Sequence, residues 1–139
     1  MRLSVEEARR RFATSPVARL ATVRPDGAPH VVPVVFALDG DVVTIAVDHK
    51  PKRSSRLQRL VNVRAEPRCS LLVDHYDHDW ARLWWVRVDG AAAVVDEPSA
   101  SHPGLRALVD RYPAYRDRPP TGPVIEVAVR RWSGWAAAA

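Results

Sequence analysis

The stretch ARLATVRPDGAPHVVPVVF, residues 18–36, indicates the fold class. Residues 17–23 alternate weakly between apolar and polar side chains, and residues 29–38 form an almost unbroken apolar run. Between them, RPDG at 24–27 places a proline and a glycine where they favour a tight turn. The pattern therefore predicts a β-hairpin with one strand over Val17–Val23 and the next over Pro29–Leu38.

More strands follow at short spacing on both sides of the middle of the chain. DGD at 39–41 is a second tight turn, and Val42–Val47 is rich in β-branched residues. Cys69–Asp74 is typical of a buried strand. Two further strand regions are expected over Arg82–Asp96, with Gly90 as a bulge or bend, and over Val124–Trp132.

Three short helices are expected between these strands. Ser4 and Glu7 form a capping box that begins the first helix, which ends near Thr14. The second helix follows Asp48, and the third lies within Pro98–Tyr112. The apolar stripe expected for the second helix is made of Leu57, Leu60 and Val61.

The order of these elements predicts a mainly β protein. Six short antiparallel strands with peripheral helices are typical of a barrel, and no strand–helix alternation supports a doubly wound sheet. The chain of 139 residues shows no internal repeat and no linker, so we expect a single domain over residues 1–139.

Composition narrows the classes of function. The chain is 47% hydrophobic without a run of 18 apolar residues, and its first residues lack the apolar stretch of a leader. We therefore expect a cytoplasmic protein without a membrane partner. Cys69 is the single cysteine and is predicted to be a buried, inert thiol. The net charge of +5 indicates an anionic partner, which nucleic acid, a phosphorylated coenzyme or an acidic protein would satisfy.

A basic segment, DHKPKRSSRLQRL at 48–60, follows the third strand and runs into the second helix. Both lysines of the chain, Lys50 and Lys52, fall within it. A phosphate placed at the start of the helix would meet these cations and the helix dipole together, with a serine able to cap the helix. The segment therefore predicts an anion clamp, although the same pattern also fits a solvated basic helix face.

A second cluster, DHYDHD at 74–79, holds two histidines and three aspartates. His75 and His78 lie three apart at a strand end, where a shared face is not assured, so we expect no metal site. A polar loop that orders the neighbouring Trp80 is the favoured interpretation. No nucleophile motif, G-x-G-x-x-G or P-loop sequence is present, so hydrolase and kinase functions have no support.

Tryptophans gather in the second half of the chain. In the strand RLWWVRVD, Trp84, Val86 and Val88 share one face. If that face is core, Trp85 and Arg87 point outward, which suits either a subunit interface or a flat ring ligand.

Together these motifs resemble a known family. The pattern at 18–36, followed by DGDVVTIAVD and KPKR, resembles the split-barrel flavin- and deazaflavin-binding family related to pyridoxamine 5′-phosphate oxidase. RLWWVRVDG and the terminal RRWSGW are similar to an actinobacterial branch described as coenzyme F420-dependent oxidoreductases. The resemblance implies a six-stranded antiparallel split β-barrel that forms a homodimer, with two cofactor sites in grooves between the subunits.

The resemblance also implies which residues hold the cofactor. The coenzyme phosphate would lie on the loop after the third strand and on the helix after it, and the ring along two strands, with a tryptophan supplied by the partner subunit. The helix RLQRLVNVRAEP is longer than in many relatives. By position, the phosphate residues are Lys50, Lys52, Arg53, Ser54 and Arg56; the ring residues are Pro33, Val34, Val47 and Asp48; and the tryptophans are Trp85 and Trp135.

The function implied is an F420-dependent oxidoreductase that transfers a hydride between the coenzyme and a small organic substrate. Such a protein needs few catalytic side chains of its own, because the deazaflavin or flavin supplies the hydride chemistry. An FMN-binding oxidoreductase of the pyridoxamine 5′-phosphate oxidase type and a non-catalytic coenzyme- or haem-binding protein are the alternatives. A nucleic-acid-binding barrel is disfavoured, because the aromatic residues lie far in sequence from the basic segment.

Overall fold

The computed structural model describes residues 1–47 and 54–138, with the helical backbone alone for 54–57. All seven of its strands lie in one antiparallel sheet in the order β2-β1-β5-β6-β7-β4-β3. The strands are β1 (Ala18–Val23), β2 (Pro29–Val34), β3 (Ala37–Asp39), β4 (Val42–Ala46), β5 (Arg68–His75), β6 (Trp84–Val95) and β7 (Val124–Ala136). The helices are α1 (Val5–Thr14), α2 (Ser54–Ala65), α3 (Pro103–Arg111), α4 (Pro113–Asp117) and the 3₁₀ turn η1 (Trp80–Arg82).

The predicted hairpin and the mainly β architecture are confirmed. β1 and β2 pair from Ala18 with Val34 to Val23 with Pro29, and Gly27 adopts the positive φ of 89° that its turn requires. The expected second strand over Pro29–Leu38 is broken into β2 and β3. The break allows β2 to pair with β1 and β3 to pair with β4, so the chain crosses from one end of the sheet order to the other.

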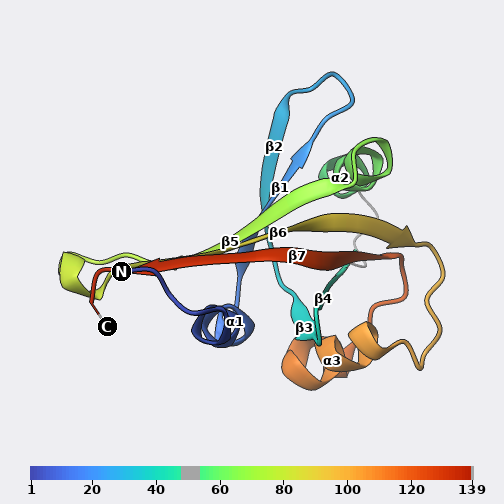
Figure 1. Ribbon diagram of the computed structural model, residues 1–139. Coiled ribbons are helices and arrows are strands. Elements are labelled where there is room, and N and C mark those ends of the chain that lie inside the picture. Colours follow the sequence, from blue (N-terminus) through green and yellow to red (C-terminus); the bar gives the residue numbers. More distant parts are fainter. Residues whose placement is uncertain (48–53, 139) are drawn as a thin grey trace.

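Long strands form the body of the molecule (Figure 1). β5, β6 and β7 run side by side, and the β1–β2 hairpin rises from one side of them while α1 and α3 lie on the other. The register between β6 and β7 shifts between Asp89 and Gly90, which confirms the bulge predicted at Gly90. The amino-terminal segment extends the sheet edge, since the amide of Leu3 donates to the carbonyl of Gly134 at 2.9 Å.

The core lies on the inner face of this sheet. Helices α1 and α2 supply four of its buried apolar side chains, namely Ala8, Phe12, Leu60 and Val63, which pack with Leu71, Val86 and Val88 of the strands. The stripe expected on α2 was partly wrong, because Val61 is 48% exposed whereas Val63 and Asn62 are buried. The buried face of α2 is therefore rotated from the one that the apolar pattern predicted.

Helix α3 packs on β3 and β4, at the end of the strand order opposite to β2. Helix α4 packs against α3. α3 packs so closely on β4 that Gly104 touches the side chain of Thr44. Arg111 donates to the carbonyls of Phe36 and Ser15, and the Tyr112 hydroxyl donates to that of Pro16. Short α4 was not expected, because the third predicted helix ends by Tyr112.

Candidate functional site

The candidate site begins where β4 ends. The amide of Val47 donates to the carbonyl of Pro123 at 3.0 Å, and the side chain of Val47 is buried. The chain therefore leaves the sheet from a fixed point immediately before the basic segment. Asp48, Lys50, Lys52 and Arg53 lie outside the described residues, so their assignment to a coenzyme stays a prediction.

Helix α2 follows that segment and begins at Ser54. Its first turn contains no acidic residue, so no carboxylate of that turn neutralises the positive end of the helix dipole. Arg56 lies in the same turn, although the structure describes only backbone there, as it does for Ser54. A helix start without a neutralising carboxylate, preceded in the sequence by basic residues, suits a phosphate.

Two predicted ring residues, Pro33 and Val34, lie on β2. The side chain of Val34 is buried and belongs to the same core cluster as Val47, so it can present only its backbone to a ring. Pro33 is exposed and pairs in register with Arg19 on β1. Only Pro33 of this pair can offer its side chain to a ligand at the surface.

The two predicted tryptophans, Trp85 and Trp135, are paired across β6 and β7. They line a hollow of about 540 Å³, together with Arg2, Leu3, Val5, Arg87, Arg131, Trp132, Ser133 and Gly134. The guanidinium of Arg87 lies 5.6 Å from the centroid of the Trp85 ring, and Trp135 is 39% exposed. Aromatic rings beside arginines form a surface that suits a flat, negatively charged ligand.

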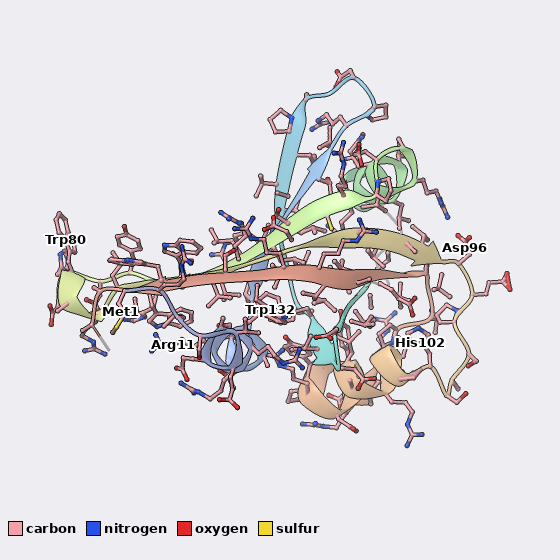
Figure 2. The ribbon with its side chains drawn as sticks, viewed as in Figure 1. Met1, Arg11, Trp80, Asp96, His102 and Trp132 are labelled. Carbon is pink, nitrogen blue, oxygen red and sulfur yellow. The ribbon has the colours of Figure 1, made fainter. Side chains whose placement is uncertain are left out.

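These two parts of the predicted site are far apart in one chain. Val124 of β7 pairs with Ala46 beside the basic segment, whereas Trp135 lies 11 residues further along the same strand. At roughly 3.3 Å per residue, this separation is about 36 Å. The opposite ends of the molecule are visible in Figure 2, with Trp80 at one and Asp96 and His102 at the other. One ring that lies against Val47 therefore cannot also touch Trp135 of the same chain.

The outer face of the sheet extends from Pro33 on β2 to Ser133, which lines the tryptophan hollow. Its central row runs across five strands, through Pro33, Arg19, Leu72, Arg87 and Ser133. The apolar side chain of Val31 on this face is 62% exposed, and Leu72 and Trp135 are also exposed. Because the described helices that pack on these strands contribute to the core on the inner face, this outer face is left accessible.

A buried polar cluster under α2 was missed by sequence reasoning. The Asn62 side chain is fully buried, and its amide nitrogen donates to the Thr22 hydroxyl of β1 at 3.0 Å. The Gln58 amide donates to the Asn62 oxygen at 2.7 Å. His30 lies opposite Thr22 in the β1–β2 register, and burial together with Arg24 and Arg59 lowers its pKa from 6.5.

The histidine-rich loop is a polar loop held by hydrogen bonds among its own side chains and amides. His75 interacts with the Asp77 carboxylate at 2.9 Å, and Asp79 caps η1 by accepting from the amide of Ala81. The turn that Asp79 caps begins at Trp80, whose carbonyl accepts from the amide of Leu83 and whose side chain is 74% exposed. Within residues 1–47 and 54–138, no group of three or more histidine, cysteine or carboxylate side chains could hold a metal ion.

Cys69 is buried, as predicted. Burial, with a smaller effect of Asp89, raises the pKa of its thiol to about 11. Since the thiolate is the reactive form, this thiol is inert near neutral pH.

No helix among the described residues has the length and apolar character needed to cross a membrane. The expectation of a cytoplasmic protein stays a prediction.

Comparison with protein families gives a match over almost the whole chain. A family model described as pyridoxamine 5′-phosphate oxidase matches residues 4–136. No curated protein matches the chain.

Solved structures share the fold. A conserved hypothetical protein from Mycobacterium tuberculosis is 26% identical, with a TM-score of 0.77 over 97% of this chain and 86% of that one. A FAD-binding protein from Mesorhizobium loti is 22% identical, with a TM-score of 0.71 over 96% of this chain and 95% of that one. A haem-binding protein from Mycobacterium smegmatis is 21% identical, with a TM-score of 0.71 over 99% of this chain and 60% of that one.

Proposed function

This chain belongs to the pyridoxamine 5′-phosphate oxidase family, a family of flavin-binding oxidoreductases, and from that premise we propose that it is an F420-dependent oxidoreductase. It would transfer a hydride between this deazaflavin and a small organic substrate. The assignment of the cofactor follows the resemblance of RLWWVRVDG and RRWSGW to the F420-dependent branch.

The observation that supports the coenzyme site best is the start of α2. No carboxylate in its first turn offsets the helix dipole, and the preceding sequence supplies Lys50, Lys52 and Arg53. A phosphate there would gain charge-assisted hydrogen bonds as well as the attraction of the dipole. The net charge of +5 suits F420, because its phosphate and glutamate tail carry several negative charges. FMN, with a single phosphate, calls for less positive charge.

The protein's own contribution is to bind and orient the coenzyme. The bound deazaflavin supplies the hydride chemistry. The residues around Val47 and Pro33 would hold one face of the ring, and the clamp would hold the phosphate. This division of work agrees with the absence of a nucleophile motif from the sequence.

We propose that a second copy of the chain completes the site. Val47 and Trp135 lie about 36 Å apart along β7 of one chain, at roughly 3.3 Å per residue. The outer face with Leu72 and Arg87 would be covered in a homodimer. Each coenzyme would then meet the clamp of one subunit and Trp85 or Trp135 of the other.

FMN is the second candidate for the cofactor, because the matching family model describes a pyridoxamine 5′-phosphate oxidase. A coenzyme- or haem-binding protein without turnover is the third, and a protein of this fold from Mycobacterium smegmatis binds haem. Yellow protein with bound FMN would favour the second. Saturable binding without turnover of any acceptor would favour the third.

The proposal is tested by titrating the purified protein with F420 and FMN in parallel and following the quenching of tryptophan fluorescence. We expect selective, saturable quenching by F420. In the variant Lys52→Ala with Arg53→Ala, affinity should fall at least about tenfold, since charge-assisted hydrogen bonds contribute roughly 1.5–3 kcal/mol each.

A matched control removes two positive charges elsewhere. Arg106→Ala with Arg116→Ala changes exposed residues of α3 and α4 and should leave the affinity unchanged. An equal loss of coenzyme affinity in both double variants would show that only the net charge matters and that Lys52 and Arg53 form no specific clamp. If the variant Lys52→Ala with Arg53→Ala binds the coenzyme as tightly as the wild type, the clamp hypothesis is rejected.

A further inference from the structure

We propose that Asn62 is a positioning residue for the coenzyme phosphate, because its buried hydrogen bond to Thr22 fixes the orientation of α2 on the sheet. The inference rests on the proposed function, since it concerns the helix whose first turn would hold the phosphate. Asn62 itself lies in the second half of that helix and would not touch the coenzyme.

The hydrogen bonds define how Asn62 is held. Its oxygen accepts from the Gln58 amide at 2.7 Å, which turns its nitrogen toward the Thr22 hydroxyl at 3.0 Å. Asn62 and Thr22 are both buried, so the bond is protected from water. Breaking a buried hydrogen bond of this kind costs free energy, because both polar groups would be left without a partner. The hydrogen bond is also directional, so it restrains the position of Asn62 relative to Thr22.

The apolar contacts of α2 lack this directionality, and the ion pair from Arg64 to Asp96 is exposed to solvent. Leu60 and Val63 are the buried apolar side chains described on the helix, and both pack into the core cluster. Apolar contacts favour burial but do not by themselves select one rotation or one axial position. Because Val61 next to them is an exposed apolar residue, a rotated helix could bury it instead. The Asn62–Thr22 hydrogen bond selects the observed rotation.

The orientation set at Asn62 reaches the start of the helix. Ser54 and Asn62 are separated by eight residues of continuous α-helix, about 12 Å at 1.5 Å per residue. A rotation or sliding of the helix at Asn62 therefore also moves the backbone amides of the first turn. Those amides act on a phosphate only when they point at it.

The test separates phosphate recognition from general loss of structure. We measure the affinity for F420 and for its phosphate-free deazaflavin alcohol, and the same for FMN and riboflavin, and take the ratio within each pair. Thr22→Val removes the hydroxyl with little change of volume. We expect it to lower the preference for the phosphorylated ligand about three- to tenfold while leaving the affinity for the phosphate-free ligand unchanged. Asn62→Leu should do the same.

Two variants serve as controls. Thr22→Ser keeps the hydroxyl and should restore the wild-type ratio. Thr44→Val makes the same chemical change at another buried threonine, on β4 against α3, and should not alter the ratio. Equal weakening of both ligands in Thr22→Val would overturn the positioning role and indicate a structural one only, and an unchanged ratio in both Thr22→Val and Asn62→Leu would also overturn it.

Failure of the proposed function gives a different result. If the wild type itself shows no preference for the phosphorylated ligand, the phosphate site is wrong and the positioning role falls with it. Amide hydrogen exchange of residues 54–65 in the coenzyme-free protein then still reports on the bond itself. We expect faster exchange in Thr22→Val than in Thr44→Val, and equal rates would show that the bond does not restrain α2.

Discussion

Single residues of this protein owe their chemistry to their surroundings, and Cys69 is a clear case. Its thiol is buried, and desolvation raises its pKa to about 11. We therefore expect the native protein to resist alkylation by iodoacetamide at neutral pH, measured as the absence of a mass increase by intact-protein mass spectrometry. The protein unfolded in urea should react fully, because the same thiol is then exposed. Rapid labelling of the native protein would contradict the inert assignment.

His30 makes the stability of the protein depend on pH. Its pKa in the folded state is lowered from 6.5, first by burial and then by Arg24 and Arg59. Between the lowered pKa and 6.5 the unfolded chain binds a proton that the folded chain does not, so the free energy of unfolding falls as the pH falls through this window. This contribution is fully present above 6.5.

The variant His30→Gln isolates that contribution in urea unfolding at several pH values from about 7.5 to about 5. We expect the wild type to lose more stability than the variant over this range. Glu7 does not interfere, since hydrogen bonds to Arg10 and Arg11 lower its pKa from 4.5 to about 2 and its effect begins only below 4.5. If the free energy of unfolding changes with pH in parallel for the two proteins, the pKa of His30 is the same in the folded and the unfolded chain.

At the scale of elements, the contact between α3 and β4 is set by a glycine. A Cβ added to Gly104 would lie 2.6 Å from the Cβ of Thr44, which leaves no space for it. Gly104→Ala should therefore lower the free energy of unfolding by about 1–3 kcal/mol, the usual cost of overpacking. Thermal and urea unfolding measure this loss.

Gly122→Ala is the matched control for that variant. Its added Cβ would meet the Val47 carbonyl oxygen at 3.7 Å, an ordinary contact distance. Its stability should stay within about 0.5 kcal/mol of the wild type. If Gly104→Ala is equally tolerated, α3 is free to move away from β4 and its packing there does not fix the fold.

Elements with a local signal could be predicted from the sequence, and those decided by distant partners could not. The RPDG turn and the bulge at Gly90 follow from local patterns, and both are present. The break of the strand predicted over Pro29–Leu38 depends on distant partners, because its first half pairs with β1 and its second half pairs with β4. On α2, Val61 and Val63 are equally apolar, and only the packing of the helix decides which one is buried.

For the whole molecule, the sequence predicted the family, whereas the geometry of the tryptophan hollow could not be predicted from it. β4 ends at Ala46 and α2 begins at Ser54, and the basic residues between them lie outside the described residues. The pairing of Trp85 with Trp135 follows from the register of β6 and β7, which no local pattern contains. Asn62 gave no signal either, because a single asparagine on a helix is ordinarily exposed.

The separation of clamp and tryptophans leads to a prediction about assembly. If each coenzyme contacts the clamp of one subunit and a tryptophan of the other, two different defective chains can complement each other. Chains with Lys52→Ala and Arg53→Ala would be mixed with chains carrying Trp85→Ala and Trp135→Ala, then unfolded and refolded together. Neither variant alone should bind the coenzyme well. Random pairing makes half of the dimers mixed with one intact site each, so the mixture should regain about a quarter of the wild-type binding capacity.

The recovered sites are counted by coenzyme titration, and the oligomeric state is measured by analytical ultracentrifugation on the same samples. Mixing without refolding is the control, since intact dimers that do not exchange subunits should regain no sites. A dimeric mixture that recovers no binding would show that clamp and tryptophans act in separate places. A monomeric protein that binds the coenzyme with full affinity would reject the second copy, because one chain alone holds the two regions about 36 Å apart at roughly 3.3 Å per residue.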